Sequence, residues 1–268
     1  MNAERASDTW QQGDAYERYV GRWSRRVAPA FLRWLDAAPG LRWLDVGCGT
    51  GALTEAILDG CAPASVVGVE PSDGFLTTAR ERLGERAVLL TGSAEVIPQD
   101  DASADVVVSG LVLNFVPDAR AAVADLLRVT APGGTIAAYV WDYAGRMELM
   151  RYFWDAAAEL DPDAPDEGAR FPLCDPLALE DLFAGPRFAA VGVSSLDVPT
   201  PFASFDDYWE PFLGGQGPGP AYAMSLDGDA RAQLRERLRA RLPIRGDGSI
   251  PLIARAWAVR ASVAGVSR

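Results

Sequence analysis

A glycine-rich turn carries the clearest chemical signal in this sequence. The segment LDVGCGTGALTEAIL runs from a strand-like stretch through Gly47, Gly49 and Gly51 into a helix-like stretch. Because glycine lacks a Cβ, such a turn lets a ligand lie against bare backbone, and the following helix start offers N–H groups without intrahelical partners. Glu70 ends the next strand-like run, where a carboxylate can accept two hydrogen bonds from a ribose diol. The pattern predicts a site for a nucleoside-containing cofactor.

The elements that must hold this turn alternate regularly between about residues 40 and 140. Apolar runs of strand length alternate there with helix-length segments, which is typical of repeated βαβ units and a parallel sheet. The expected strands cover residues 41–46, 65–70, 87–90, 104–109 and 134–141, and the clearest helices cover 50–58, 74–83 and 118–130. We therefore predict an α/β fold, with a doubly wound, Rossmann-like sheet that carries helices on both faces.

Beyond Trp141 the alternation loosens, and the chain divides into further segments. Strands expected over 188–198 and 250–260 resume the sheet, and the stretches before and between them are predicted insertions. The predicted organisation is an N-terminal helical lid (1–39), a cofactor-binding core (40–141), a cap insertion (142–175), a continuation of the core (176–198), a second cap insertion (199–248), and a final strand and tail (249–268). We expect the two insertions to meet above one face as a cap.

The composition excludes several kinds of chemistry. All 25 basic residues are arginine, histidine is absent, and 37 acidic residues bring the net charge to −12. Ser-His-Asp triads, Cys-His pairs, histidine-ligated zinc and Schiff-base lysines are therefore excluded, and no metal site is expected. A strongly acidic chain also argues against nucleic acid as a partner, because phosphate backbones are bound by broad basic surfaces.

The cysteine residues and the N-terminal segment indicate the cellular compartment. Cys48, Cys61 and Cys174 are odd in number and show no CxxC spacing, which argues against a disulfide framework. The first residues lack a basic start followed by an apolar stretch, and no window of 18 uninterrupted apolar residues occurs. We expect a cytoplasmic protein with no membrane partner.

The glycine turn also distinguishes between cofactors, because GCGTG does not follow the GxGxxG dinucleotide fingerprint. The sequence resembles the class I S-adenosylmethionine-dependent methyltransferases, whose (L/V)DxGxGxG motif is matched by Asp45, Gly47, Gly49 and Gly51. LLRVTAPGGTIAAYVW resembles a later motif of that family, and the combination looks like its UbiE-like small-molecule branch. The resemblance covers about residues 15–198. It implies a seven-stranded mixed sheet with a final antiparallel strand, the cofactor S-adenosylmethionine, and the product S-adenosylhomocysteine.

The resemblance also implies positions for the cofactor contacts. Glu70 would hold the ribose, TGSAEVIP (91–98) would lie beside the adenine, and SGLVLNFVPD (109–118) would lie under the methionine part. Ser93 replaces the aspartate usual in that branch, and a neutral hydrogen bond is weaker than a charge-assisted one. An N-terminal helix would fold over the cofactor, and one of its arginines, Arg22, could pair with the methionine carboxylate. The expected contacts are Asp45, Gly47, Cys48, Gly49, Gly51, Glu70, Pro71, Ser93, Ala94, Glu95, Ser109, Gly110, Leu111, Tyr19 and Trp23.

The expected reaction is in-line methyl transfer to a small acceptor, apolar or aromatic, by a monomer or homodimer. Asn114, Tyr16 and Asp142 are the catalytic candidates, although Asn114 could equally cap the following turn. Ten aromatic residues could wall the acceptor pocket, and a minority of them is expected to touch the acceptor: Trp141, Tyr143, Tyr152, Phe153, Trp154, Phe202, Phe205, Tyr208, Trp209 and Phe212. Two alternatives remain open. One is a non-catalytic protein that binds the cofactor or its product; the other is an NAD(P)-dependent oxidoreductase, which the turn spacing and the missing Tyr-x-x-x-Lys pair disfavour.

Overall fold

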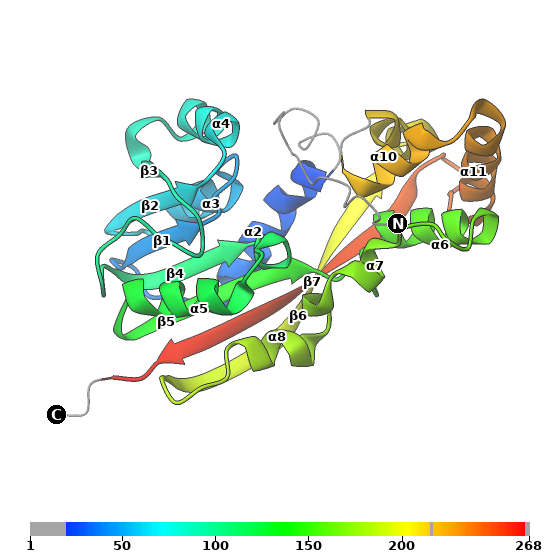
Figure 1. Ribbon diagram of the computed structural model, residues 1–268. Coiled ribbons are helices and arrows are strands. Elements are labelled where there is room, and N and C mark those ends of the chain that lie inside the picture. The colour runs from blue at the N-terminus through cyan, green and yellow to red at the C-terminus, as the bar shows by residue number, and fades with distance from the viewer. Residues whose placement is uncertain (1–19, 215–216, 266–268) are drawn as a thin grey trace.

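A single mixed sheet of seven strands forms the centre of the computed structural model, which describes residues 20–214 and 217–265 (Figure 1). The strand order is β3-β2-β1-β4-β5-β7-β6, and β7 alone runs antiparallel to its neighbours. The strands are β1 (Arg42–Val46), β2 (Ser65–Glu70), β3 (Val88–Thr91), β4 (Ala104–Gly110), β5 (Thr130–Trp141), β6 (Phe188–Phe202) and β7 (Ile250–Val263). The predicted fold class and the final antiparallel strand are confirmed.

Helices cover both faces of this sheet. Trp43 and Leu44, adjacent in β1, point to opposite faces and enter two separate hydrophobic clusters, as the two-residue period of a strand requires. α2 (Arg22–Leu35) and α3 (Ala52–Gly60) pack on the Trp43 side, and α5 (Ala119–Val129) and α8 (Pro176–Leu182) pack on the Leu44 side. α4 (Asp73–Leu83) packs against β2 and β3. None of the helices in the described residues is long and apolar enough to cross a membrane.

Side-chain caps explain where several helices begin. The Ser72 hydroxyl accepts a hydrogen bond from the Phe75 N–H at 3.4 Å, and the Asp118 carboxylate accepts one from Ala121 at 2.9 Å. These bonds satisfy N–H groups that the first helical turn leaves without partners. The start of β5 differs from the prediction. The strand begins at Thr130, directly after α5, rather than at residue 134. Thr130 already pairs with Ala104, and an irregularity in the register follows before regular pairing resumes.

A long hairpin of β6 and β7 carries a second group of helices at one end of the sheet, on the right of Figure 1. We call this group the helical unit; it comprises α6 (Glu148–Leu160), α7 (Glu167–Arg170), α9 (Phe205–Trp209), the 3-10 helix η5 (Glu210–Gly214), α10 (Pro218–Ser225) and α11 (Gly228–Arg241). The predicted boundary at residue 198 is wrong, since β6 stays paired with β7 as far as Phe202.

The two insertions meet each other, but they do so at one end of the sheet rather than as a cap above one of its faces (Figure 1). Phe153 of α6 stacks on Phe212 of η5, with 4.2 Å between ring centroids and 3° between planes, and Arg241 of α11 pairs with Glu159 of α6 at 2.5 Å. The aromatic residues of this unit therefore form a core of their own.

Candidate cofactor site

A cavity of about 540 Å³ lies at the carboxyl ends of the parallel strands, where open α/β sheets bind ligands. It collects most of the cofactor contacts expected from the sequence: Asp45, Gly47, Cys48, Gly49, Glu70, Pro71, Ser93, Ala94, Glu95, Gly110 and Leu111. These residues come from the ends of β1, β2 and β4 and the segment after β3. The topology thus brings together residues that the sequence separates widely.

The glycine turn is fixed to β2 and opens toward the cavity. The N–H groups of Gly47 and Cys48 both donate to the Val69 carbonyl, at 2.7 and 3.0 Å. Gly49 has a φ of +55°, and a Cβ built on it would meet nothing within 4 Å. Gly49 therefore presents bare backbone to open space, which suits the close approach of a ligand.

The carboxylate of Glu70 is held in place from two sides. Its Oε2 accepts from the Gly49 N–H and its Oε1 accepts from the Ser72 N–H, each at 3.0 Å. Burial raises the pKa of Glu70, and these two hydrogen bonds oppose that rise. Each carboxylate oxygen can still accept a further hydrogen bond, so the group can receive a pair of hydroxyls.

Asp45 lies deeper and keeps one oxygen without a partner. The Thr54 hydroxyl donates to Oδ2 at 2.7 Å, while the buried Oδ1 has no hydrogen-bond partner among the described residues. Burial raises the pKa of Asp45 from 3.8 to about 7, and the nearby charge of Glu70 adds to the rise. A buried carboxylate in this state favours a cationic ligand, because a positive charge would stabilise its ionised form.

Burial also raises the pKa of the Cys48 thiol, so Cys48 stays protonated and serves as a small turn residue.

The structure does not bring every expected contact to the cavity. Gly51 is the N-cap residue of α3, and a Cβ there would lie 3.0 Å from Leu83 of α4, so this glycine serves helix packing. The Ser109 hydroxyl is buried and donates to the Val46 carbonyl at 2.9 Å. Trp23 packs edge-on against Phe202, with 5.2 Å between ring centroids.

Arg22, expected to pair with the cofactor's carboxylate, instead pairs with Asp207 at 2.8 Å. Tyr19, which was also expected to contact the cofactor, lies outside the described residues.

The catalytic candidates also require correction. Asp142 does not line the cavity, because its carboxylate closes a turn by accepting from the N–H groups of Gly145 and Arg146 at 2.8 and 3.0 Å. Asn114 lies beside the cavity rather than in its wall, with its Nδ2 4.0 Å from the Cys174 sulfur and its Oδ1 buried without a partner among the described residues. Tyr16 lies outside the described residues.

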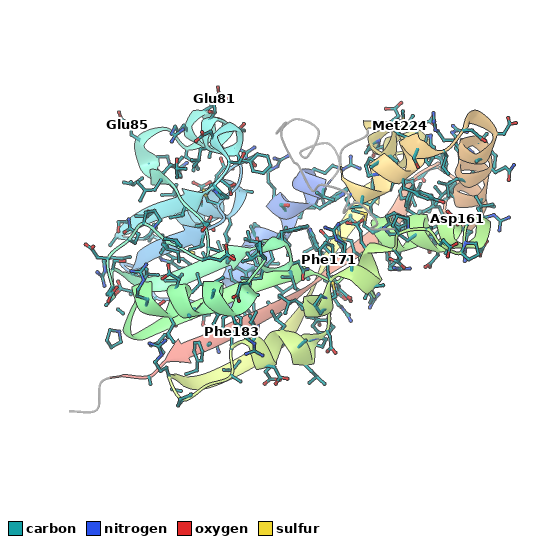
Figure 2. All side chains as sticks on the ribbon, in the orientation of Figure 1. Glu81, Glu85, Asp161, Phe171, Phe183 and Met224 are labelled. Carbon is teal, nitrogen blue, oxygen red and sulfur yellow. The ribbon has the colours of Figure 1, made fainter. Side chains whose placement is uncertain are left out.

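An aromatic wall completes the cavity, and only part of it was predicted from the sequence. Trp141 and Tyr143 line the cavity, as a minority of the ten aromatic candidates was expected to do, and Tyr139 and Phe115 join them. Tyr139 and Trp141 alternate at the end of β5, and Tyr143 follows in the next turn, so the period of two was the signal that could have found Tyr139. Phe171 braces this wall, with its ring 5.2 Å from those of Phe115 and Tyr143 (Figure 2, where it lies between the sheet and the helical unit).

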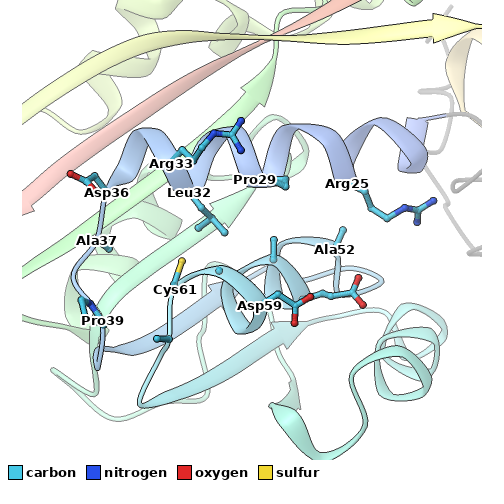
Figure 3. A pocket seen from close by; sticks show the side chains of 14 residues that line it. Arg25, Pro29, Leu32, Arg33, Asp36, Ala37, Pro39, Ala52, Asp59 and Cys61 are labelled. Atoms are coloured by element: carbon cyan, nitrogen blue, oxygen red, sulfur yellow. The ribbon is translucent and has the colours of Figure 1, made fainter.

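A larger hollow of about 720 Å³ lies between α2 and α3, away from the glycine turn (Figure 3). Leu32 and Cys61 point toward each other across it, and arginines of α2 and acidic residues of α3 surround them. This hollow contains neither the glycine turn nor Glu70, so its size does not make it the cofactor site.

The fold is Rossmann-like, and the cavity at the carboxyl edge of its sheet is suited to a nucleoside cofactor. Residues 44–138 match the family model described as "Methyltransferase domain". This part of the chain is therefore a methyltransferase domain, and the predicted resemblance to class I S-adenosylmethionine-dependent methyltransferases is confirmed for it.

Curated relatives match a stretch of about half of the chain. Trans-aconitate 2-methyltransferase of Variovorax paradoxus is 34% identical over 122 residues, which cover 46% of each chain. Malonyl-[acyl-carrier protein] O-methyltransferase of Serratia marcescens is 34% identical over 132 residues, or 49% of this chain and 48% of that one. The chain thus spans about half the length of the curated relatives it matches.

Solved structures share the fold over a longer stretch. A putative methyltransferase from an antibiotic biosynthesis pathway of Anabaena variabilis has a TM-score of 0.57 at 21% identity and covers 87% of this chain and 96% of its own. Phosphoethanolamine N-methyltransferase 2 of Haemonchus contortus, solved with phosphomonomethylethanolamine and S-adenosylhomocysteine, has a TM-score of 0.57 at 17% identity and covers 97% of this chain and 58% of its own. At these identities the likeness establishes the fold alone.

Proposed function

We propose that the whole chain transfers a methyl group from S-adenosylmethionine to a small organic acceptor. The observation that carries this proposal is the convergence of three features on one cavity: the open backbone at Gly49, the fixed carboxylate of Glu70 and the unpartnered buried oxygen of Asp45. The first two suit a nucleoside, and the third suits a ligand that carries positive charge.

The residues present fit this cofactor. Glu70 would hold the ribose hydroxyls, Ser93 and Ala94 would lie beside the adenine, and Asp45 would face the charged methionine part. Asp45, Glu70 and Glu95 all line the cavity and favour a cation within it. When bound, the cofactor supplies an activated methyl group on a sulfonium, so the driving force of the reaction does not depend on a protein base.

The chain's own contribution is to position the reactants and exclude water. The wall of Phe115, Tyr139, Trp141 and Tyr143 suits an apolar or aromatic acceptor, and holding such an acceptor in line with the methyl group can lower the barrier by roughly 7–11 kcal/mol. The chain contains no histidine, so any proton would leave through another group or from an acidic acceptor. We further propose a UbiE-like small-molecule enzyme of the cytoplasm, monomeric or homodimeric. The named relatives support methyl transfer to small molecules.

Isothermal titration calorimetry tests the cofactor, and turnover of labelled methyl groups tests catalysis. We expect S-adenosylmethionine and S-adenosylhomocysteine to bind and NADH not to bind. If neither S-adenosylmethionine nor S-adenosylhomocysteine binds, the proposal is overturned. Binding without turnover across a library of phenols, amines and ketones would instead indicate a non-catalytic binder.

A further inference from the structure

Leu111, directly after β4, breaks the alternation of side chains that this strand sets up. Val108 belongs to the hydrophobic cluster on the Trp43 side of the sheet, and Val107 belongs to the cluster on the Leu44 side. A period of two would therefore direct the side chain at position 111 to the Leu44 side. Leu111 is half-buried and packs instead against the Trp43-side cluster, which includes the part of the aromatic wall that follows from β5. Its φ of +65° accounts for the reversal, because this left-handed conformation is not that of an extended strand.

Neighbouring contacts hold Leu111 in this conformation. Its N–H donates to the Tyr139 carbonyl at 2.7 Å. The Tyr139 hydroxyl occupies the space that a side chain of Gly110 would need, only 2.6 Å from a Cβ built there. On the other side, Val112 packs so closely on the glycine turn that a Cβ on Gly47 would collide with it. A left-handed φ at a leucine costs free energy and persists only where the surrounding structure imposes it, as these contacts do.

The position of Leu111 in the sheet places it between the two parts of the cavity. Glu70 and Ser93, at the ends of β2 and β3, lie on the side that suits the nucleoside, and the aromatic wall at the end of β5 lies on the other side. β1 and β4 lie between these strands, and Leu111 lines the cavity directly after β4. An apolar side chain at this point limits the room that an acceptor has beside the aromatic wall.

We propose that Leu111 is a specificity-determining residue, whose side chain narrows the acceptor end of the cavity and restricts the site to aromatic acceptors without a bulky branched substituent. This inference rests on the proposed function and concerns the shape of the acceptor that the same site takes. Leu111→Ala removes three carbon atoms from the cavity lining. An isopropyl group on the acceptor ring has the same number of carbon atoms, so it should fit the space that this variant opens.

Calorimetry on the full chain saturated with S-adenosylhomocysteine tests the proposal with two matched pairs of probes. One pair is 4-methylphenol and 4-isopropylphenol, and the other is acetophenone and its 4-isopropyl derivative. For a pair that binds, the ratio of the two dissociation constants should shift in Leu111→Ala by at least about fivefold toward the isopropyl compound, relative to the parent. An unchanged ratio overturns the inference, as does the failure of all four probes to bind a complex that holds S-adenosylhomocysteine. Absence of S-adenosylhomocysteine binding is the separate result that overturns the proposed function.

Two glycine variants separate the side chain from the backbone strain. Leu111→Gly removes both, so it should shift the ratio as Leu111→Ala does and unfold at a higher urea concentration than Leu111→Ala. It also keeps the test available if Leu111→Ala does not fold. If Leu111→Ala is the more stable of the two, the left-handed backbone on which the inference depends is contradicted.

Ala102→Gly is the matched control, because Ala102 also has a positive φ, of +54°, and lies outside the cavity lining. This variant should keep the ratio of the parent. A shift as large as that of Leu111→Gly would mean that relief of backbone strain, rather than removal of the Leu111 side chain, changes the site, and would overturn the inference.

Discussion

The cavity and the helical unit differ in whether their polar groups have hydrogen-bond or ion-pair partners. In the helical unit, Glu159 pairs with both Arg237 and Arg241, and the buried Tyr208 hydroxyl donates to the Leu149 carbonyl at 2.9 Å. In the cavity, Asp45 keeps a buried oxygen without a partner. Buried polar groups are normally satisfied, so an unpartnered carboxylate oxygen in a residue that lines a cavity suits a bound ligand.

Backbone conformation shows the same contrast. Gly47 and Gly49 lie at the cavity with positive φ, and so does Leu111, whose φ is 65°. Leu111 cannot escape the steric cost of that region as glycine does. In the helical unit, no residue within its described helices has a positive φ. The cavity therefore contains strained backbone at Leu111, whereas the described helices of the helical unit contain none and do not line the cavity.

The largest effect should come from breaking the core of the helical unit. Phe153 is fully buried and stacks on Phe212, so Phe153→Ala should lower the free energy of unfolding by about 3–5 kcal/mol. Chemical denaturation measures this loss. The exposed Met224 in the same unit provides the control (Figure 2), and Met224→Ala should have little effect.

Cofactor affinity of the folded Phe153→Ala protein should stay within about twofold of the parent, because no described residue of the helical unit lines the cavity. A large loss of affinity would show that the two regions are coupled.

Gly49→Val should weaken binding of S-adenosylhomocysteine by on the order of 100-fold, or about 3 kcal/mol. The valine side chain would occupy space that the ligand needs and would move the N–H that contacts Glu70. Gly84 is a matched control, because its φ of +58° is close to the +55° of Gly49 and it too has no atom within 4 Å of a built Cβ, although it lies outside the cavity.

Both glycine variants should lose similar stability through backbone strain, and only Gly49→Val should lose affinity in calorimetry. Equal affinity in the two proteins would place the cofactor elsewhere.

The sequence predicted most of the sheet because buried parallel strands are continuous apolar runs bounded by glycine and polar turns. It missed the end of β6, where Pro199 and Pro201 argue against a strand. β6 lies at the edge of the sheet, and an edge strand tolerates proline because one side of it needs no ladder hydrogen bonds. Strand position in the sheet is set by the whole topology, which a local pattern does not contain.

The site shows the same limit. Residues of the glycine turn and the end of β2 could be placed from sequence, because a strand-turn-helix unit fixes them locally. Trp23 could not, since its orientation depends on Phe202, which is distant in the sequence. Asp142 was misassigned because its turn-closing bonds to Gly145 and Arg146 become visible only in the folded backbone.

Asp45→Asn should change stability and affinity in opposite directions. The pKa of Asp45 is raised to about 7 in the folded protein, so this carboxyl favours folding below about pH 4 and loses that contribution as the pH rises through 7. Asparagine avoids the loss and can still accept from Thr54. We expect the free energy of unfolding of the variant to match the parent near pH 4 and to exceed it by about 1–3 kcal/mol at pH 8.

Calorimetry should show weaker binding of S-adenosylmethionine to the same Asp45→Asn protein. Denaturation at both pH values checks the first expectation, and a variant less stable than the parent at pH 8 would contradict the account of this buried carboxyl.

Glu159→Gln should have the smallest effect, because surface ion pairs contribute little. Hydrogen bonding from Arg237, followed by the charge of Arg241, lowers the pKa of Glu159, so the pairing operates above that pKa and disappears as the pH falls through it. Removing one negative charge from a chain of net charge −12 also relieves general repulsion. Glu81→Gln, at a surface position without an ion pair among the described residues, measures that relief (Figure 2).

Relative to Glu81→Gln, the melting temperature of Glu159→Gln should fall by about 2 °C or less at low salt. The difference should vanish in molar sodium chloride, where exposed charges are screened. A difference that persists in high salt would mean that these arginines stabilise the helical unit by packing, because their long side chains can cover apolar surface without their charge.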